Sequence, residues 1–362
     1  MEKYVKHGVA AVGSVIVVLL VAAWALQSPD TNKLRAAADT DIKQNKFSAA
    51  EDLVKRALAS DEKKLGSDSP VVATDLTLLG RVYLKQGKYV DAEQAFKRSK
   101  EIHEQVLKPG LLALTDSLDG LGMTYTAEGK LEDAGDLLEQ SLQVREDNLP
   151  DNDVKVAEGQ NSLARLYFDA GAYPEAEALF RQSEKSYEKA LGSESPEVAT
   201  VRNNLAALYF AKGKYAQAEP LYKWTLSIHE KNSGKDSIDV ASTLNNLGEL
   251  YRAQGRFAEA EPLYNRALTI YEKTAGPDSA YVAACLNNLA LTYQAQKKFV
   301  DAEPLYKRAI AINEKVLGSN HIAVANMMRN YSVLLRATGR DADAARMESK
   351  VNTIGAKPGT IN

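Results

Sequence analysis

The chain has little of what a catalytic or metal-binding protein uses. Its 362 residues include one cysteine, Cys285, and four histidines that stand far apart. A single thiol cannot form an internal disulfide, and no H-x-x-x-H or C-x-x-C spacing indicates a metal site. No P-loop and no G-x-G-x-x-G segment occurs. We therefore expect no enzymatic activity, no metal and no cofactor, and we expect Cys285 to be a small buried hydrophobe.

The chain also lacks an excess of either charge. It has 45 basic and 48 acidic residues, which gives a formal net charge of −3. Binding to nucleic acid requires a basic face or stripe that draws in the phosphate backbone. The balance of charge therefore speaks against a nucleic-acid partner.

What the chain does contain is one pattern, G-K-Y-x-x-A, repeated eight times at intervals of 42 residues. The first position holds Gly87, Gly129, Gly171, Gly213, Gly255 and Gly339, with Asn45 and Lys297 in the other two copies. The last position is alanine in every copy, namely Ala50, Ala92, Ala134, Ala176, Ala218, Ala260, Ala302 and Ala344. A period this constant predicts stacked supersecondary units, none of which buries its apolar face alone.

Residues 195–236 show what one unit contains. Ser195 and Pro196 suit a helix N-cap and a first helical position, and an apolar face at helical spacing follows them. Gly213 is predicted to end this first helix with a positive φ. A second helix begins near Tyr215 and contains Ala218, whose small side chain indicates close helix packing. The same capping position is occupied elsewhere by Ser69, Asp153, Ser237 and Ser279, and we expect local bends at Pro220, Pro262 and Pro304.

These residues resemble the tetratricopeptide repeat, whose pattern Leu247, Gly248, Tyr251, Gly255, Ala260, Tyr264 and Ala267 match. The N-N-L-A-x-L-Y and A-E-P-L-Y-x-R-A segments and the 42-residue spacing make it similar to the repeats of kinesin light chains and their bacterial relatives. The resemblance implies an all-α, right-handed superhelical solenoid of about eight stacked helix–turn–helix repeats over residues 31–350. It also implies a concave groove, lined by first helices, that binds a partner protein or peptide. The heptad coiled coil that joins kinesin light chains to their motor is absent, so we do not expect this chain to attach to a motor.

The one long apolar run lies near the N-terminus. Residues 8–26 contain nineteen uncharged residues, which is long enough to cross the roughly 30 Å hydrocarbon layer of a bilayer. We expect a short tail over residues 1–7, a transmembrane helix over 8–26, a single-pass membrane protein with its repeats on the periplasmic or extracytoplasmic side, and a disordered tail over 351–362. A cleaved signal peptide is the alternative, since Ala23-Trp24-Ala25 fits the small-x-small cleavage pattern.

Pairs of asparagines at one-repeat spacing are the candidate binding residues. One member of each pair, at Asn204, Asn246, Asn288 and Asn330, is expected to face the groove, where an amide both donates to and accepts from a peptide backbone. The preceding position holds Asn161, Asn203, Asn245 and Asn287, and Arg165, Arg252 and Arg336 are expected to flank the groove. The alternative interpretation is that these asparagines bond between adjacent helices and serve only the stack.

The sequence thus predicts a membrane-anchored scaffold that binds a partner protein or an extended peptide in the groove. An exported soluble adaptor or chaperone-like factor is the first alternative, and an enzyme-associated regulatory subunit is the second. In the last repeat, Asp341 and Asp343 indicate a polar cap that ends the stack. Neither the identity of the partner nor the oligomeric state follows from the sequence.

Overall fold

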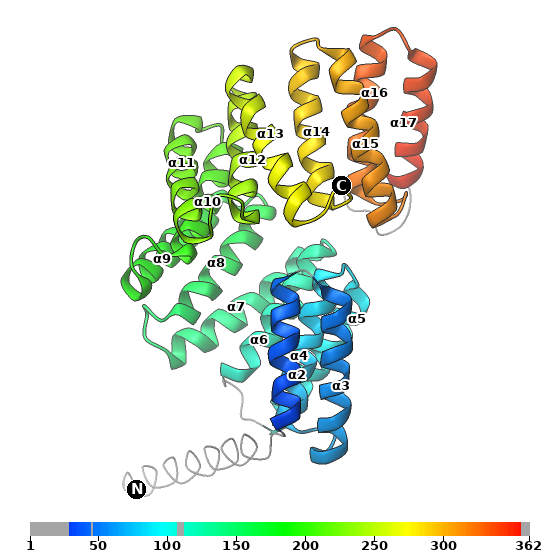
Figure 1. The fold of residues 1–362 in the computed structure, drawn as a ribbon. Helices are drawn as coiled ribbons and strands as arrows, with labels where there is room; N and C mark the ends of the chain where they lie inside the picture. The colour runs from blue at the N-terminus through cyan, green and yellow to red at the C-terminus, as the bar shows by residue number, and fades with distance from the viewer. Residues whose placement is uncertain (1–28, 45, 107–111, 356–362) are drawn as a thin grey trace, which may run out of the picture. The chain divides into compact units, whose positions relative to one another are not determined.

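The computed structural model describes residues 29–44, 46–106 and 112–355. Over these residues the fold is all-helical, with sixteen helices and no strand (Figure 1). They form eight pairs, α2 (Pro29–Lys43) with α3 (Phe47–Leu65), α4 (Pro70–Lys85) with α5 (Tyr89–Val106), α6 (Leu112–Ala127) with α7 (Leu131–Asn148), α8 (Val154–Asp169) with α9 (Tyr173–Leu191), α10 (Pro196–Ala211) with α11 (Tyr215–Asn232), α12 (Ile238–Ala253) with α13 (Phe257–Thr274), α14 (Ala280–Ala295) with α15 (Phe299–Leu317), and α16 (Ile322–Ala337) with α17 (Asp341–Gly355). The prediction of an all-α solenoid of paired helices is confirmed.

The helices belong to two compact units. Unit 1 ends at Gly171 and contains α2 to α8, whereas unit 2 begins at Ala172 and contains α9 to α17. Within each unit, a second helix packs against the first helix of the following repeat, and the first helices of neighbouring repeats also contact one another. Successive first helices therefore line one side of a unit. We call the side formed by α10, α12, α14 and α16 the first-helix face of unit 2.

Local sequence signals explain where the helices begin and end. The Ser195 hydroxyl accepts a hydrogen bond from the Val198 amide at 3.3 Å, so it caps α10 as predicted. Gly213 follows the end of α10. Its φ of +69° lies in the left-handed region, which glycine adopts at little cost. Lys297 holds the corresponding turn at φ +60° without being glycine.

The repeated alanine is buried in every helix pair. All eight of these alanines are fully buried, which confirms the predicted packing point. Large side chains fill the space beside them, and Phe96, Phe180, Tyr264 and Tyr306 are each at most 1% exposed. Cys285 is also fully buried, as expected, and burial raises the pKa of its thiol to about 12.

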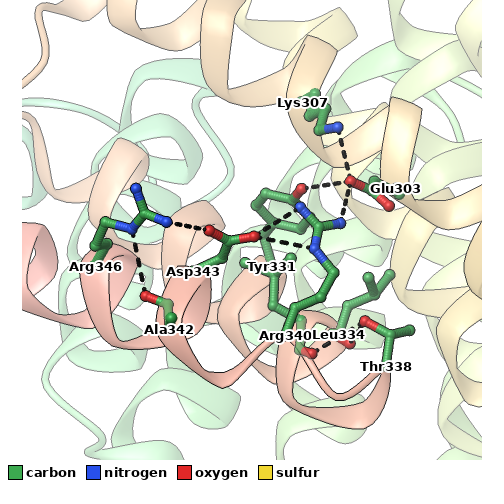
Figure 2. Close-up of polar contacts among 10 residues, drawn as sticks. Glu303, Lys307, Tyr331, Leu334, Thr338, Arg340, Ala342, Asp343 and Arg346 are labelled. Atoms are coloured by element: carbon green, nitrogen blue, oxygen red, sulfur yellow. Dashed lines mark hydrogen bonds and ion pairs between the residues drawn. The ribbon is translucent and has the colours of Figure 1, made fainter.

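A polar clamp joins neighbouring repeats. In unit 2, the Glu219 carboxylate of α11 accepts a hydrogen bond from the Tyr251 hydroxyl at 3.1 Å and from Arg256 at 2.8 Å, both of which belong to the next repeat. Glu303 of α15 repeats the arrangement with Tyr331, Arg340 and Lys307 (Figure 2). Arg340 and Arg346 also bind Asp343, so the predicted polar cap of the last repeat is part of this network.

The expected single-pass membrane localisation has to be corrected. No helix among residues 29–44, 46–106 and 112–355 is both long enough and apolar enough to cross a membrane. The uncharged helix α14 has 16 residues, whereas a span requires roughly 20. The longer helices carry several charged side chains, as in α15. The predicted transmembrane segment, residues 8–26, lies outside the described residues, as do residues 1–7. The disordered tail was predicted over residues 351–362, but residues 351–355 form the last turn of α17, with Val351 and Ile354 buried, and residues 356–362 lie outside the described residues.

Candidate functional site

The asparagines of unit 2 form a ladder along its first-helix face. The second asparagine of each pair donates its side-chain amide to the first asparagine of the preceding repeat. The three bonds run from Asn246 to Asn203 at 3.3 Å, from Asn288 to Asn245 at 3.2 Å and from Asn330 to Asn287 at 3.1 Å. All of these side chains are half-buried, as is that of Asn204 on α10. Asn161 is also half-buried and lies on α8 of unit 1.

The ladder has a clear structural role. Each bond uses one N–H of one amide and one lone pair of the other, although a primary amide offers two of each. The alternative interpretation, that the asparagines bond between adjacent helices, therefore describes three contacts of unit 2. It does not exhaust the hydrogen-bonding capacity of the amides. Peptide binding by the same side chains stays a prediction.

The three arginines predicted to flank the groove differ in their surroundings. Arg252 of α12 keeps a quarter of its side chain exposed and lies 3.7 Å from Glu249 on the same helix. Arg336 of α16 is held by Glu348 of α17, with hydrogen bonds of 2.9 and 2.6 Å to the two carboxylate oxygens. Arg165 is an exposed residue of α8 in unit 1. Of the two predicted arginines in unit 2, Arg252 is therefore the one held less tightly by a carboxylate.

Two buried tyrosines lie close to Arg252. Its buried Nε makes no hydrogen bond among the described residues, and its guanidinium lies close to the hydroxyl of the fully buried Tyr264. Arg252 interacts electrostatically with Tyr264 and Tyr306, and burial raises the pKa of both phenols. The Tyr306 hydroxyl donates to Gln294 Oε1 at 2.8 Å. This part of unit 2 therefore combines buried aromatic rings with the partly exposed guanidinium of Arg252.

Unit 1 uses the ladder position differently, and our sequence interpretation overlooked this. Arg35, Thr77 and Asp119 precede Asn161 at multiples of 42 residues. Arg35 pairs with the buried Asp61, and Asp119 pairs with the fully buried Arg145 at 2.6 Å. In both pairs the partner lies 26 residues later in the chain. The basic residue comes first in the Arg35–Asp61 pair, and the acidic residue comes first in the Asp119–Arg145 pair. Following the repeat register beyond the asparagines would have found these positions.

The described residues contain no group of three or more histidine, cysteine, aspartate or glutamate side chains that could hold a metal ion. The buried His229 lies within hydrogen-bond distance of Thr243, with its Nδ1 3.1 Å from the hydroxyl oxygen. The raised pKa of the buried Cys285 disfavours the thiolate that a nucleophile requires.

Comparisons with known proteins agree with this architecture. The tetratricopeptide repeat family model matches residues 31–105, 71–147, 111–189, 155–231, 239–315 and 287–351. No curated protein matches the chain.

Solved structures similar to the chain include other repeat proteins. BtubC (BKLC) from P. vanneervenii is 23% identical over 69% of this chain and 94% of its own, with a TM-score of 0.50. A putative kinesin light chain from Podosopora anserina with nearly identical TPR-like repeats is 26% identical over 57% of this chain and 97% of its own, with a TM-score of 0.48. A Rap protein complexed with Competence and Sporulation Factor is 12% identical over 90% of this chain and 97% of its own, with a TM-score of 0.61.

The matched family is one of repeats rather than of enzymes, and its model extends over nearly all of the described residues. With its 42-residue helix pairs, this chain belongs to the tetratricopeptide repeat family.

Proposed function

We propose that the chain is a scaffold that binds an extended segment of a partner protein along the first-helix face of unit 2. The asparagine ladder is the observation that carries the proposal. Its amides recur once per repeat, and each retains donor and acceptor capacity beyond the bond that joins it to its neighbour. An extended backbone presents the complementary donors and acceptors at regular spacing.

The surroundings of the ladder support a peptide ligand. Leu291 and Val333 stand at equivalent positions of α14 and α16, and Val333 is 54% exposed. Arg252 adds a guanidinium that keeps a quarter of its side chain exposed. Apolar contacts with a few well-placed polar groups are what peptide-binding surfaces combine.

The similar Rap protein was solved in complex with Competence and Sporulation Factor. That likeness concerns the fold alone, at 12% identity, and it supports the proposal only as evidence that this architecture accommodates a bound factor.

A selection from a random peptide library against the full chain tests the proposal. We expect selected peptides whose affinity falls about three- to tenfold in Asn246→Ala and in Asn288→Ala, because each variant removes a hydrogen bond worth roughly 0.5–1.5 kcal/mol. Titration calorimetry gives the affinity, and thermal unfolding monitored by circular dichroism gives the stability of each variant.

Val300→Ala is the matched control. Val300 is 88% exposed on the second helix α15, away from the ladder, so its replacement should change neither affinity nor melting temperature. A large loss of melting temperature with unchanged affinity in both asparagine variants would show that the ladder serves the stack alone.

A further inference from the structure

A buried cluster in unit 1 contains more negative than positive charge. Arg35 of α2 donates to Asp75 of α4 from Nε at 2.6 Å and also pairs with Asp61 of α3. Asp61 and Asp75 are at most 1% exposed, and Arg35 has 13% of its side chain exposed. Two carboxylates therefore share one guanidinium away from water. An unneutralised carboxylate is costly to bury, and it reduces that cost by binding a proton.

The hydrogen-bond inventory leaves room for such a proton. Asp61 Oδ1 is buried and has no partner among the described residues, so it is an acceptor without a donor. The side chain of Asp61 also interacts directly with Asp75. A proton on Asp75 supplies the missing donor and neutralises the cluster in one step.

The cluster is the polar part of the contact that holds α2 in place. The apolar part joins Ala38 of α2 to Val54 of α3 and to Leu78, Leu79 and Val82 of α4, with Ile42 packed beside them. The α2 helix contributes only Ala38 and Ile42 to this core. We therefore expect the protonation state of the charged cluster to affect the docking free energy of α2 substantially.

We propose that α2 is a proton-controlled helix: one proton shared by Asp61 and Asp75 tightens its docking on α3 and α4, and loss of that proton loosens it. Loosening uncovers the apolar surface of Val54 and Leu78 that α2 covers. The device is independent of the peptide-binding proposal, since it lies in the other unit.

The electrostatics of the cluster determine how docking of α2 depends on pH. Burial is the largest effect on Asp75 and raises its pKa to about 6, although Arg35 acts to lower it and Asp61 acts to raise it. The unfolded pKa of aspartate is about 3.9. A carboxyl group with a raised folded pKa binds its proton more tightly in the docked state, so docking is strongest at low pH and weakens as pH rises through about 6.

The charges that act most strongly on this proton come from α2 and α3. The groups that act most strongly on Asp75 are Arg35 from α2 and Asp61 from α3. The buried titratable groups of α5 and α6 are His103 and Asp119, and Asp116 beside them is exposed. These act on one another and on Arg145.

Hydrogen exchange of the full chain, measured by mass spectrometry and corrected for the intrinsic effect of pH on exchange, tests the proposal. A change of folded pKa to about 6 predicts that residues 29–43 are roughly tenfold better protected at about pH 5 than at about pH 7.5. Equal protection at the two pH values, or better protection at the higher one, would overturn the proposal.

Two variants identify the groups, and one serves as control. Asp75→Asn carries no titratable proton and should remove the difference between the two pH values. Asp61→Asn leaves Arg35 and Asp75 as a one-to-one pair, and the difference should shrink well below tenfold. Glu51→Gln on α3 replaces a carboxylate whose pKa its hydrogen bond to Lys55 lowers to about 2, so this variant should retain the tenfold difference. A difference that persists in both aspartate variants would assign the effect to other groups.

Discussion

Lys297 adopts a backbone conformation that its side chain disfavours. Its φ of +60° matches the +69° of Gly213 and the +73° of Gly255 at the same turn of other repeats. A residue with a Cβ pays roughly 1–2 kcal/mol in this left-handed region, whereas glycine does not. The sequence already indicated this site, because Lys297 breaks a run of glycines at a constant spacing.

Lys297→Gly should therefore stabilise unit 2. We expect a gain of roughly 0.5–1 kcal/mol, since the greater entropy of unfolded glycine offsets part of the relief. The reverse change, Gly255→Lys, should cost a similar or larger amount. Urea unfolding monitored by circular dichroism measures both, and a midpoint that falls in Lys297→Gly would contradict the argument.

The buried pair of Asp119 and Arg145 gives a second prediction at this scale. Arg145 is 1% exposed, and its guanidinium lies against Gly159, where an added Cβ would come within 2.9 Å of it. Arg145→Met removes the partner of a buried carboxylate and should destabilise unit 1 by about 3–5 kcal/mol.

Removing both charges should be much milder. In the double variant Asp119→Leu with Arg145→Met no uncompensated charge remains, so most of the lost stability should return. Free energies of unfolding in urea give the comparison. A double variant as unstable as the single one would show that Arg145 acts through packing rather than through charge.

At the scale of helices, most of the fold was predictable from the sequence. The 42-residue period, the capping serines and the turn glycines each act within a few residues of the chain, so helix pairs and their ends follow from local rules. The clamp between repeats was harder to foresee. In the last repeat Leu335 occupies the usual tyrosine position, and Tyr331, one helical turn earlier, reaches Glu303 instead.

The site was predictable only in outline. The asparagine positions follow from the repeat register, but their bonds join residues 43 positions apart and depend on the side-chain rotamers of two helices. Arg336 was expected beside the groove because of its spacing. Its salt bridge depends on Glu348 of α17, whose counterparts one and two repeats earlier are the uncharged Tyr306 and Tyr264.

The clamps predict how the stack responds to acid. Hydrogen bonds from Lys223 and from Tyr209 are the largest effects that lower the pKa of Glu219 and Glu177, respectively, each to about 2. A carboxylate with a lowered folded pKa stabilises the fold above its unfolded pKa of about 4.3, and this contribution disappears as pH falls toward 2.

We expect the melting temperature of unit 2 to fall steadily between about pH 5 and pH 2.5. Glu219→Gln should melt lower at neutral pH and lose less on acidification, because one of the titrating clamps is gone. Calorimetric scans across this pH range provide the test. An unchanged pH profile in the variant would mean that the clamp contributes nothing in solution.

At the scale of the whole molecule, the two units differ in what holds their interiors together. The buried charged residues of the described chain, Asp61, Asp75, Asp119 and Arg145, all belong to unit 1. Unit 2 has buried tyrosines and the neutral asparagine ladder instead. This division of properties places the proposed proton response in unit 1 and the proposed partner binding in unit 2.

The central claim is that the first-helix face of unit 2 binds an extended segment. Hydrogen exchange of the full chain with and without a selected peptide tests it most directly. The account predicts added protection in α12 and α14, with less in α13 and α15 and none in α2 to α5. Protection confined to second helices or to unit 1 would contradict it.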